Sequence, residues 1–113
     1  MATTTVKTQT PALVMASASS FYTVSAGSVI GNMKELLLCN TTTTGTDYNI
    51  IGYIVPSGQT ASTSYMFLAS TTIASGTTVR FPFDTFMAAG SQVQLMASSA
   101  SKIMALVSAV EFS

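Results

Sequence analysis

Apolar residues occupy every second position in several stretches of this chain, which is the spacing of a β-strand with one face in a core. One stretch sets Val79, Phe81 and Phe83 against Arg80, Pro82 and Asp84. Two others alternate in the same way, with apolar positions at Val93, Leu95 and Ala97 and at Ile103, Ala105, Val107 and Ala109. A period of two predicts strands rather than helices.

Runs rich in Val, Ile, Tyr, Phe and Thr are separated at short intervals by Gly and Pro, as in consecutive strands and turns. The predicted strands are residues 21–25, 28–39, 47–55, 64–73, 77–83, 91–98 and 102–112. Seven or eight strands with turns between them predict an all-β fold, either a single antiparallel β-sandwich or a jelly roll.

The first 20 residues differ from the rest because they are low in complexity and rich in Ala, Thr and Ser. We interpret residues 1–20 as an extended N-terminal arm that adds a strand to a neighbouring chain, and residues 21–113 as the sandwich domain. Residues 36–39 and 50–55 are apolar on both faces, as in strands that are covered twice. In so small a domain, we expect a neighbouring subunit to provide the second cover.

A short pattern of an apolar residue, two small residues, Gly and a hydroxyl residue occurs three times, in residues 24–30, 73–79 and 87–93. It predicts three equivalent tight turns in which Gly27, Gly76 and Gly90 adopt positive φ. No helix pattern follows any of these glycines, so a phosphate-binding loop is not expected. The Thr-rich residues 41–46 contain no apolar side chain and are predicted to form an exposed loop.

Composition narrows the classes of function. The chain has 113 residues, four Lys+Arg against four Asp+Glu, 7% charged residues, no His, one Cys, 18 Thr and 16 Ser. Binding to phosphate backbones requires dense Lys and Arg, and a membrane helix requires roughly 20 apolar residues, so neither nucleic acid nor a membrane is an expected partner. The apolar run in residues 11–16 is too short for a secretory signal.

Catalytic and metal sites lack their usual side chains. Without His, neutral acid–base catalysis loses its commonest group, and metal sites need clusters of Cys, His or carboxylates. Ser99 lies three residues before Lys102, but on a predicted turn rather than on a helix. We therefore expect no enzyme activity, no cofactor and no metal site.

A few single residues carry further expectations. Cys39 ends an apolar strand and is expected to be a buried small hydrophobe. Arg80 is expected to pair with a Glu or Asp across a strand or an interface. Asn40 matches a glycosylation sequon, which we attribute to chance. The four tyrosines are expected at subunit contacts rather than in a sugar-binding platform: Tyr22, Tyr48, Tyr53 and Tyr65.

The sequence resembles small β-sandwich virion proteins of tailed bacteriophages over residues 21–113. The segments that carry this resemblance are residues 34–41, 53–58, 74–80 and 107–111. The resemblance implies a structural part of a virus particle that is assembled in the host cytoplasm and forms symmetric oligomers docked on a larger shell or tube.

Taken with the composition, the resemblance predicts a non-catalytic capsid decoration or cement protein. Its expected partners are other copies of itself and the major capsid protein. A neck, tail or fibre-base component is the alternative within the structural class, and a receptor- or glycan-binding module is an alternative outside it.

Overall fold

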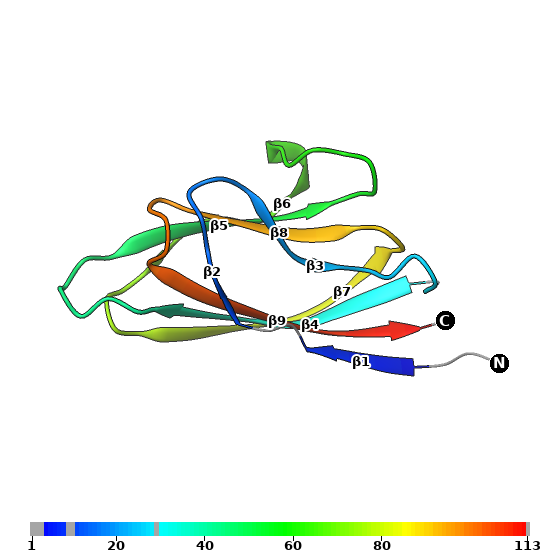
Figure 1. Ribbon diagram of the computed structural model, residues 1–113, viewed down its shortest axis with the longest axis horizontal. Coiled ribbons are helices and arrows are strands. Elements are labelled where there is room, and N and C mark those ends of the chain that lie inside the picture. The colour runs from blue at the N-terminus through cyan, green and yellow to red at the C-terminus, as the bar shows by residue number, and fades with distance from the viewer. Residues whose placement is uncertain (1–3, 9–10, 29, 113) are drawn as a thin grey trace.

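The computed structural model describes residues 4–8, 11–28 and 30–112. The regular elements of this part of the chain are strands and one short 3₁₀ turn, joined by loops (Figure 1). The turn, η1 (Thr63–Tyr65), precedes the sixth strand. The strands are β1 (Thr4–Thr8), β2 (Ala12–Leu13), β3 (Ser19–Thr23), β4 (Ile30–Asn40), β5 (Tyr48–Val55), β6 (Met66–Ile73), β7 (Thr78–Ala88), β8 (Gln92–Ala97) and β9 (Ile103–Phe112).

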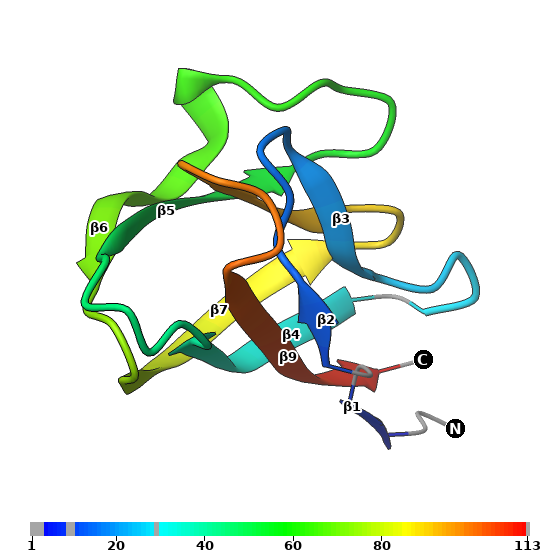
Figure 2. The same cartoon turned by 60° about the vertical axis from the view of Figure 1, so that its left-hand side comes forward.

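The strands form two antiparallel sheets that pack face to face, as Figure 2 shows. Sheet A has the order β1-β9-β4-β7, with β2 also paired to β9, and sheet B has the order β3-β8-β5-β6. From β2 onward, the strands pair from the two ends of the sequence toward its middle. The pairs are β2 with β9, β3 with β8, β4 with β7, and β5 with β6. This is the wrapping of an eight-stranded jelly roll, so the predicted fold class is confirmed and the topology selects one of its two forms.

All seven predicted strands are present, as β3 to β9, with boundaries that shift by a few residues. The largest difference is β7, which continues to Ala88 rather than ending at residue 83, because β4 offers it pairing partners as far as Ile30. The predicted alternation is confirmed as well. The inward positions of β8 and β9 are buried, whereas Arg80, Pro82 and Asp84 on β7 are exposed.

Both sheets contribute to one apolar core. Its fully buried members include Val14, Met33, Leu36, Leu38, Ile50, Ile73, Val93, Leu95, Ile103 and Val107. Val14 belongs to the predicted N-terminal arm, and its backbone bonds to Ile103 and Ser101. The expected boundary between residues 20 and 21 falls inside β3. That residues 1–20 act as a separate unit stays a prediction.

The three Gly-containing repeats form the same turn hydrogen bond, in which an amide donates to the carbonyl three residues earlier. The bonds are Ser28 to Ser25 at 3.0 Å, Thr77 to Ala74 at 3.1 Å and Ser91 to Ala88 at 3.1 Å. Gly76 and Gly90 have positive φ, 69° and 83°, as predicted. The prediction is wrong for Gly27, whose φ is not left-handed, because its turn closes without such a residue.

The second face of β5 is covered by the chain itself. Tyr53 and Val55 pair with outward-facing Gln94 and Gln92, yet they are only 8% and 1% exposed. The segment 56–65, which contains η1, lies over this face and contacts β5 (Figure 1). The expectation that a neighbouring subunit covers residues 50–55 is therefore wrong for Tyr53 and Val55, because a local loop fills that role. Ile51, on the same face, stays partly exposed.

Candidate functional site

The outer face of sheet A exposes large apolar side chains. Val6 is 73% exposed and Phe86 is 59% exposed, and Leu13 and Met104 are also exposed. The register places all four on one side of the sheet, since Val6 lies opposite Val110, and Leu13 lies opposite Met104. Partly buried apolar residues lie between them: Leu37, Cys39, Leu106 and Val110. We call these eight residues the apolar face of sheet A.

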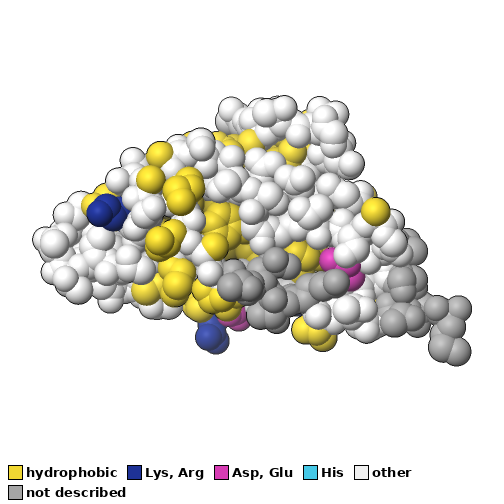
Figure 3. Space-filling model, viewed as in Figure 1, with side chains coloured by type: hydrophobic (Ala, Val, Ile, Leu, Met, Phe, Trp, Pro, Cys, Tyr) yellow, Lys and Arg dark blue, Asp and Glu magenta, His cyan; other side chains and the backbone are white. Residues whose placement is uncertain are grey.

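Figure 3 views the sandwich from the side and shows hydrophobic side chains gathered over β2 and the start of β9, at one margin of sheet A. Scattered apolar residues are normal on protein surfaces, whereas contiguous apolar patches mark contact sites. Ser108 and two ion pairs divide the apolar face of sheet A into two groups, and the strong exposure of Val6 and Phe86 makes this face a candidate interaction surface.

Two ion pairs lie on the same side of sheet A. Arg80 pairs with Glu35 at 3.2 Å, so the expectation that Arg80 has a carboxylate partner across a strand is confirmed. Lys34 pairs with Asp84 at 3.2 Å. Hydrogen bonds from Asn32 and Lys34 hold the pKa of Asp84 below its ordinary value. Exposed pairs of this kind add little stability, but they leave the surface locally neutral.

A buried carboxylate joins the two sheets at one end of the sandwich. Glu111 on β9 is 2% exposed and accepts hydrogen bonds from the Tyr22 hydroxyl at 2.5 Å, the Ser28 hydroxyl at 2.7 Å and the Ser25 amide at 3.3 Å. Burial by itself raises the pKa of Glu111, but the bonds from Tyr22, Ser28 and Ser25 outweigh it and lower that pKa to about 2. Glu111 is therefore a charged, fully hydrogen-bonded group at neutral pH.

The same contact acts on the tyrosine. Burial, together with the hydrogen bond and the negative charge of Glu111, raises the pKa of Tyr22 above its ordinary value. At neutral pH, where Glu111 is charged, Tyr22 thus remains a neutral hydrogen-bond donor. Gly31 lies opposite Glu111 and makes room for this contact, because a Cβ there would come within 3.3 Å of the Tyr22 hydroxyl and 2.8 Å of a Val24 methyl.

A second buried polar side chain organises the Thr-rich loop. Asn40 donates to the carbonyls of Ile73 at 2.8 Å and Thr46 at 3.1 Å, and it accepts from the amide and the hydroxyl of Thr42. The loop is largely exposed, as predicted. Because its amide is buried and fully bonded, Asn40 has a structural role at the base of the loop.

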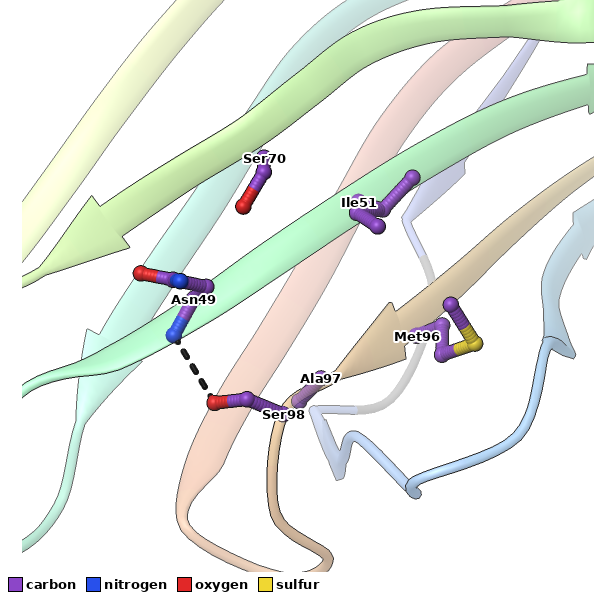
Figure 4. Close-up of a pocket in the computed structure, with 6 residues that line it drawn as sticks. All are labelled: Asn49, Ile51, Ser70, Met96, Ala97 and Ser98. Atoms are coloured by element: carbon purple, nitrogen blue, oxygen red, sulfur yellow. Dashed lines mark hydrogen bonds between the residues drawn. The ribbon is translucent and has the colours of Figure 1, made fainter. Parts of the chain in front are cut away.

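The outer face of sheet B carries a shallow hollow of about 140 Å³, lined by Asn49, Ile51, Ser70, Met96, Ala97 and Ser98. Figure 4 shows its polar groups at one side, where the Asn49 amide donates to the Ser98 hydroxyl at 3.0 Å. The hollow is small against the roughly 300–1,000 Å³ of most small-molecule sites, and its lining contains no titratable side chain. It offers room for one side chain of a partner rather than for a cofactor.

Other residues singled out from the sequence lie apart from one another. Cys39 is only partly buried, so the expectation of a buried thiol is wrong: β4 turns Cys39 toward the outer face of sheet A. Tyr22 and Tyr53 are buried, so the four tyrosines do not form one exposed platform. Ser99 and Lys102 lie in a turn, as expected.

Within residues 4–8, 11–28 and 30–112, no three Cys, Asp or Glu side chains gather closely enough to hold a metal ion. The same described part of the chain has no helix that is long and apolar enough to cross a membrane.

Sequence reasoning missed the roles of Glu111 and Asn40, although a signal for both was present. Glu111 continues the inward series that runs through Val107 and Ala109, and Asn40 continues the inward series of Leu36 and Leu38. A polar residue at an inward position of an alternating strand needs a hydrogen-bonding partner. The sequence does not reveal which partner, since Tyr22 lies 89 residues from Glu111.

No protein-family model matches the sequence, and no curated protein matches it. Solved structures do match the fold, each with 11% identity. A chain of the Bacillus endospore appendages, which are disulfide-linked pili, has a TM-score of 0.56, and the match covers 99% of this chain and 88% of that one.

Two viral chains match as well. For the infectious bursal disease virus Gx strain, the TM-score is 0.56 and the match covers 98% of this chain and 32% of the viral one. For the T13 particle of the same virus, the values are 0.52, 96% and 30%. This chain thus spans about a third of the length of the viral chains, and at such identity the likeness extends to the fold alone.

Proposed function

We propose that this protein is a structural subunit of a virus particle, and that it acts as a capsid decoration or cement protein of a tailed bacteriophage. The observation that carries the proposal is the apolar face of sheet A, on which Val6 and Phe86 are largely exposed. The jelly-roll fold, which is common in virus shells, supports the proposal by analogy only.

The proposed mechanism is mechanical. The apolar face of sheet A packs on the major capsid protein or on another copy of the chain, and each contact removes apolar area from water. Because the net charge is zero and the nearby ion pairs are internally neutral, no long-range repulsion opposes close packing of many copies. Many copies together then hold neighbouring capsomers against internal pressure.

The test measures binding of purified protein to expanded, undecorated capsids of the source virus by co-sedimentation. The variant Phe86→Asp places a charge on the exposed apolar residue of the edge strand β7 of sheet A, and we expect it to weaken binding about tenfold or more. The control Thr60→Asp adds the same charge at an exposed position in the loop between β5 and β6 and should bind as the wild type does. Equal binding by both variants, or no binding by the wild type, would contradict the proposal.

A filament subunit is the second candidate, and a specific observation favours it. The fold likeness to the Bacillus appendage chain covers nearly all of both chains, whereas the viral chains are about three times longer than this one. Electron microscopy of the purified protein, both alone and mixed with expanded capsids, separates the two. Regular filaments without capsids favour this candidate, whereas discrete particles that decorate capsids favour the cement role. A neck, tail or fibre-base location would show as labelling at the vertex or tail of intact particles.

A further inference from the structure

The strand β1 (Thr4–Thr8) is attached to the molecule by a backbone ladder, and the side chains of Thr4, Thr5 and Val6 add little to it. It pairs with β9 from Thr4 opposite Phe112 to Thr8 opposite Ser108. Thr4, Thr5 and Val6 are all exposed. Figures 1 and 2 show β1 at the margin of sheet A, beside the C-terminal half of β9. Since these three side chains bury little apolar area, their packing contributes little to holding β1 in place.

The edge that receives β1 is formed independently of it. The same half of β9, Ser108–Phe112, pairs on its other side with β4. Ala109 and Glu111 in this half are buried, and Glu111 is bonded to Tyr22 of the opposite sheet. An edge fixed in this way presents a row of unpaired backbone groups whenever β1 leaves, and such a row accepts any suitable strand.

The other free edges are less receptive. The edge strand β7 carries Arg80, Pro82 and Asp84, and charge and Pro both oppose strand addition. On sheet B, the register of β6 against β5 shifts twice and that of β3 against β8 shifts once, and bulges of this kind twist an edge away from a new partner. The C-terminal half of β9 keeps an unbroken register over five residues.

The sequence between β1 and β2 contains three residues, 9–11, and ends in Pro11. Short linkers that contain Pro favour exchange of a terminal strand between copies, because they restrict how the chain can turn back on itself. Val14, just after β2, is fixed in the core. Four residue steps separate Thr8 from Ala12, so an exchanged β1 reaches only about 14 Å from its own β2. Only a chain whose β9 edge lies directly alongside is within that reach.

We propose that β1 is exchanged between copies of this chain, so that residues 4–8 of one copy occupy the β9 edge of its neighbour in the register seen here. The exchange retains every backbone hydrogen bond of β1 and adds the contact between the two copies. It also places Val6 of one copy on the apolar face of sheet A of the next. This inference deepens the proposed function and rests on it, because it names the contact between subunits.

The test uses disulfide cross-linking in a Cys39→Ala background. Val6→Cys and Val110→Cys lie opposite each other on β1 and β9, at a spacing that a disulfide can bridge. The two substitutions are placed in separate chains, one with a tag that alters its size, and the chains are co-expressed, oxidised and separated without reductant. The matched control pairs Val6→Cys with Leu106→Cys, which lies on the same face of β9 but beyond the end of β1. A single chain carrying both Val6→Cys and Val110→Cys reports pairing within one chain.

We expect mixed covalent dimers from Val6→Cys with Val110→Cys and few or none from the Leu106→Cys control. Covalent monomers of the doubly substituted chain, without mixed dimers, would overturn the exchange, and so would the absence of any cross-link. Two measurements on the wild type distinguish failure of the exchange from failure of the proposed function: light scattering reports the oligomeric state, and co-sedimentation reports capsid binding. An oligomer that binds capsids but cross-links only within each chain rejects the exchange and retains the function. Mixed dimers that bind no capsid reject the function and retain the exchange.

Discussion

The hydroxyl of Tyr22 donates a hydrogen bond of 2.5 Å to the carboxylate of Glu111, and this bond joins β3 of sheet B to β9 of sheet A. Ser25 and Ser28, from the turn after β3, bond to the same carboxylate. One charged group thus holds together a strand from each sheet and a turn. The arrangement fixes the end of β9 to which β1 attaches, so the stability of this end bears on assembly.

Removal of the Tyr22 hydroxyl should destabilise the fold. Tyr22→Phe leaves a buried carboxylate without one of its donors, and we expect the free energy of unfolding to fall by about 1–3 kcal/mol. Urea denaturation followed by circular dichroism measures this change. Tyr65→Phe, at a partly exposed tyrosine, is the matched control and should stay within about 0.5 kcal/mol of the wild type. Equal stability of the two variants would show that the bond contributes nothing.

Acid should unfold the protein in part through Glu111. Its pKa is about 2 in the folded chain against an ordinary 4.5, so the unfolded state binds this proton more readily. The stability that Glu111 contributes is therefore complete above pH 4.5 and is lost as the pH falls toward about 2, up to about 3 kcal/mol. Denaturation midpoints measured across this range should fall less steeply for Glu111→Gln than for the wild type. Asp84 has a lowered pKa as well, but it is present in both the wild type and Glu111→Gln. The difference in pH dependence between their denaturation midpoints is therefore due to Glu111. Parallel slopes would contradict the assignment.

A side chain at position 31 should destabilise the end of the sandwich where Tyr22 contacts Glu111. In Gly31→Ala the new methyl group would lie 2.8 Å from a methyl of Val24, a short and buried side chain that has little room to move. We expect a loss of about 1–3 kcal/mol, measured by thermal or chemical denaturation.

Gly27→Ala is the matched control for Gly31→Ala. Nothing lies within 4 Å of a Cβ at Gly27, and its φ is not left-handed. This variant should be as stable as the wild type or gain up to about 1 kcal/mol, because Ala restricts the unfolded chain more than Gly does. If Gly31→Ala were as stable as Gly27→Ala, the structure around Val24 would accommodate the extra methyl group at no cost, and the lack of a side chain at Gly31 would not be required.

Asn40→Ala should loosen the Thr-rich loop. The substitution removes the Asn40 donor from the carbonyls of Ile73 and Thr46, and we expect a loss of about 1–3 kcal/mol in the free energy of unfolding. Amide hydrogen exchange should rise across residues 41–46 before it rises elsewhere. Asn49→Ala removes an exposed asparagine whose side chain bonds only to the Thr72 hydroxyl, and it should leave that exchange unchanged. Slow exchange in the loop of Asn40→Ala would contradict the role of Asn40.

Much of the fold was predictable because a period of two leaves few alternatives. The alternation from Val79 to Asp84 identified which side chains of β7 face the core, and Gly76 and Gly90 marked turns that require positive φ. The cover over Tyr53 and Val55 was not predictable, because apolar residues on both faces indicate burial without saying whether a loop or another chain supplies it. The same limit applies to Cys39, whose side of the sheet depends on the register shift in β4 between Met33 and Glu35.

By itself, the sequence determined the class of the fold, the strands and most turns, since these depend on spacing and on residue types a few positions apart. Only the tertiary structure decided that the strands wrap as a jelly roll, that Tyr22 meets Glu111 across 89 residues, and that Val6 and Phe86 share an uncovered face. The physical reason is that pairing between distant strands is set by the packing and hydrogen bonding of the whole domain. The N-terminal strand β1 shows the difference clearly. Its composition favours an extended segment, but only the fold places it on the edge of β9, whose other side is already paired with β4.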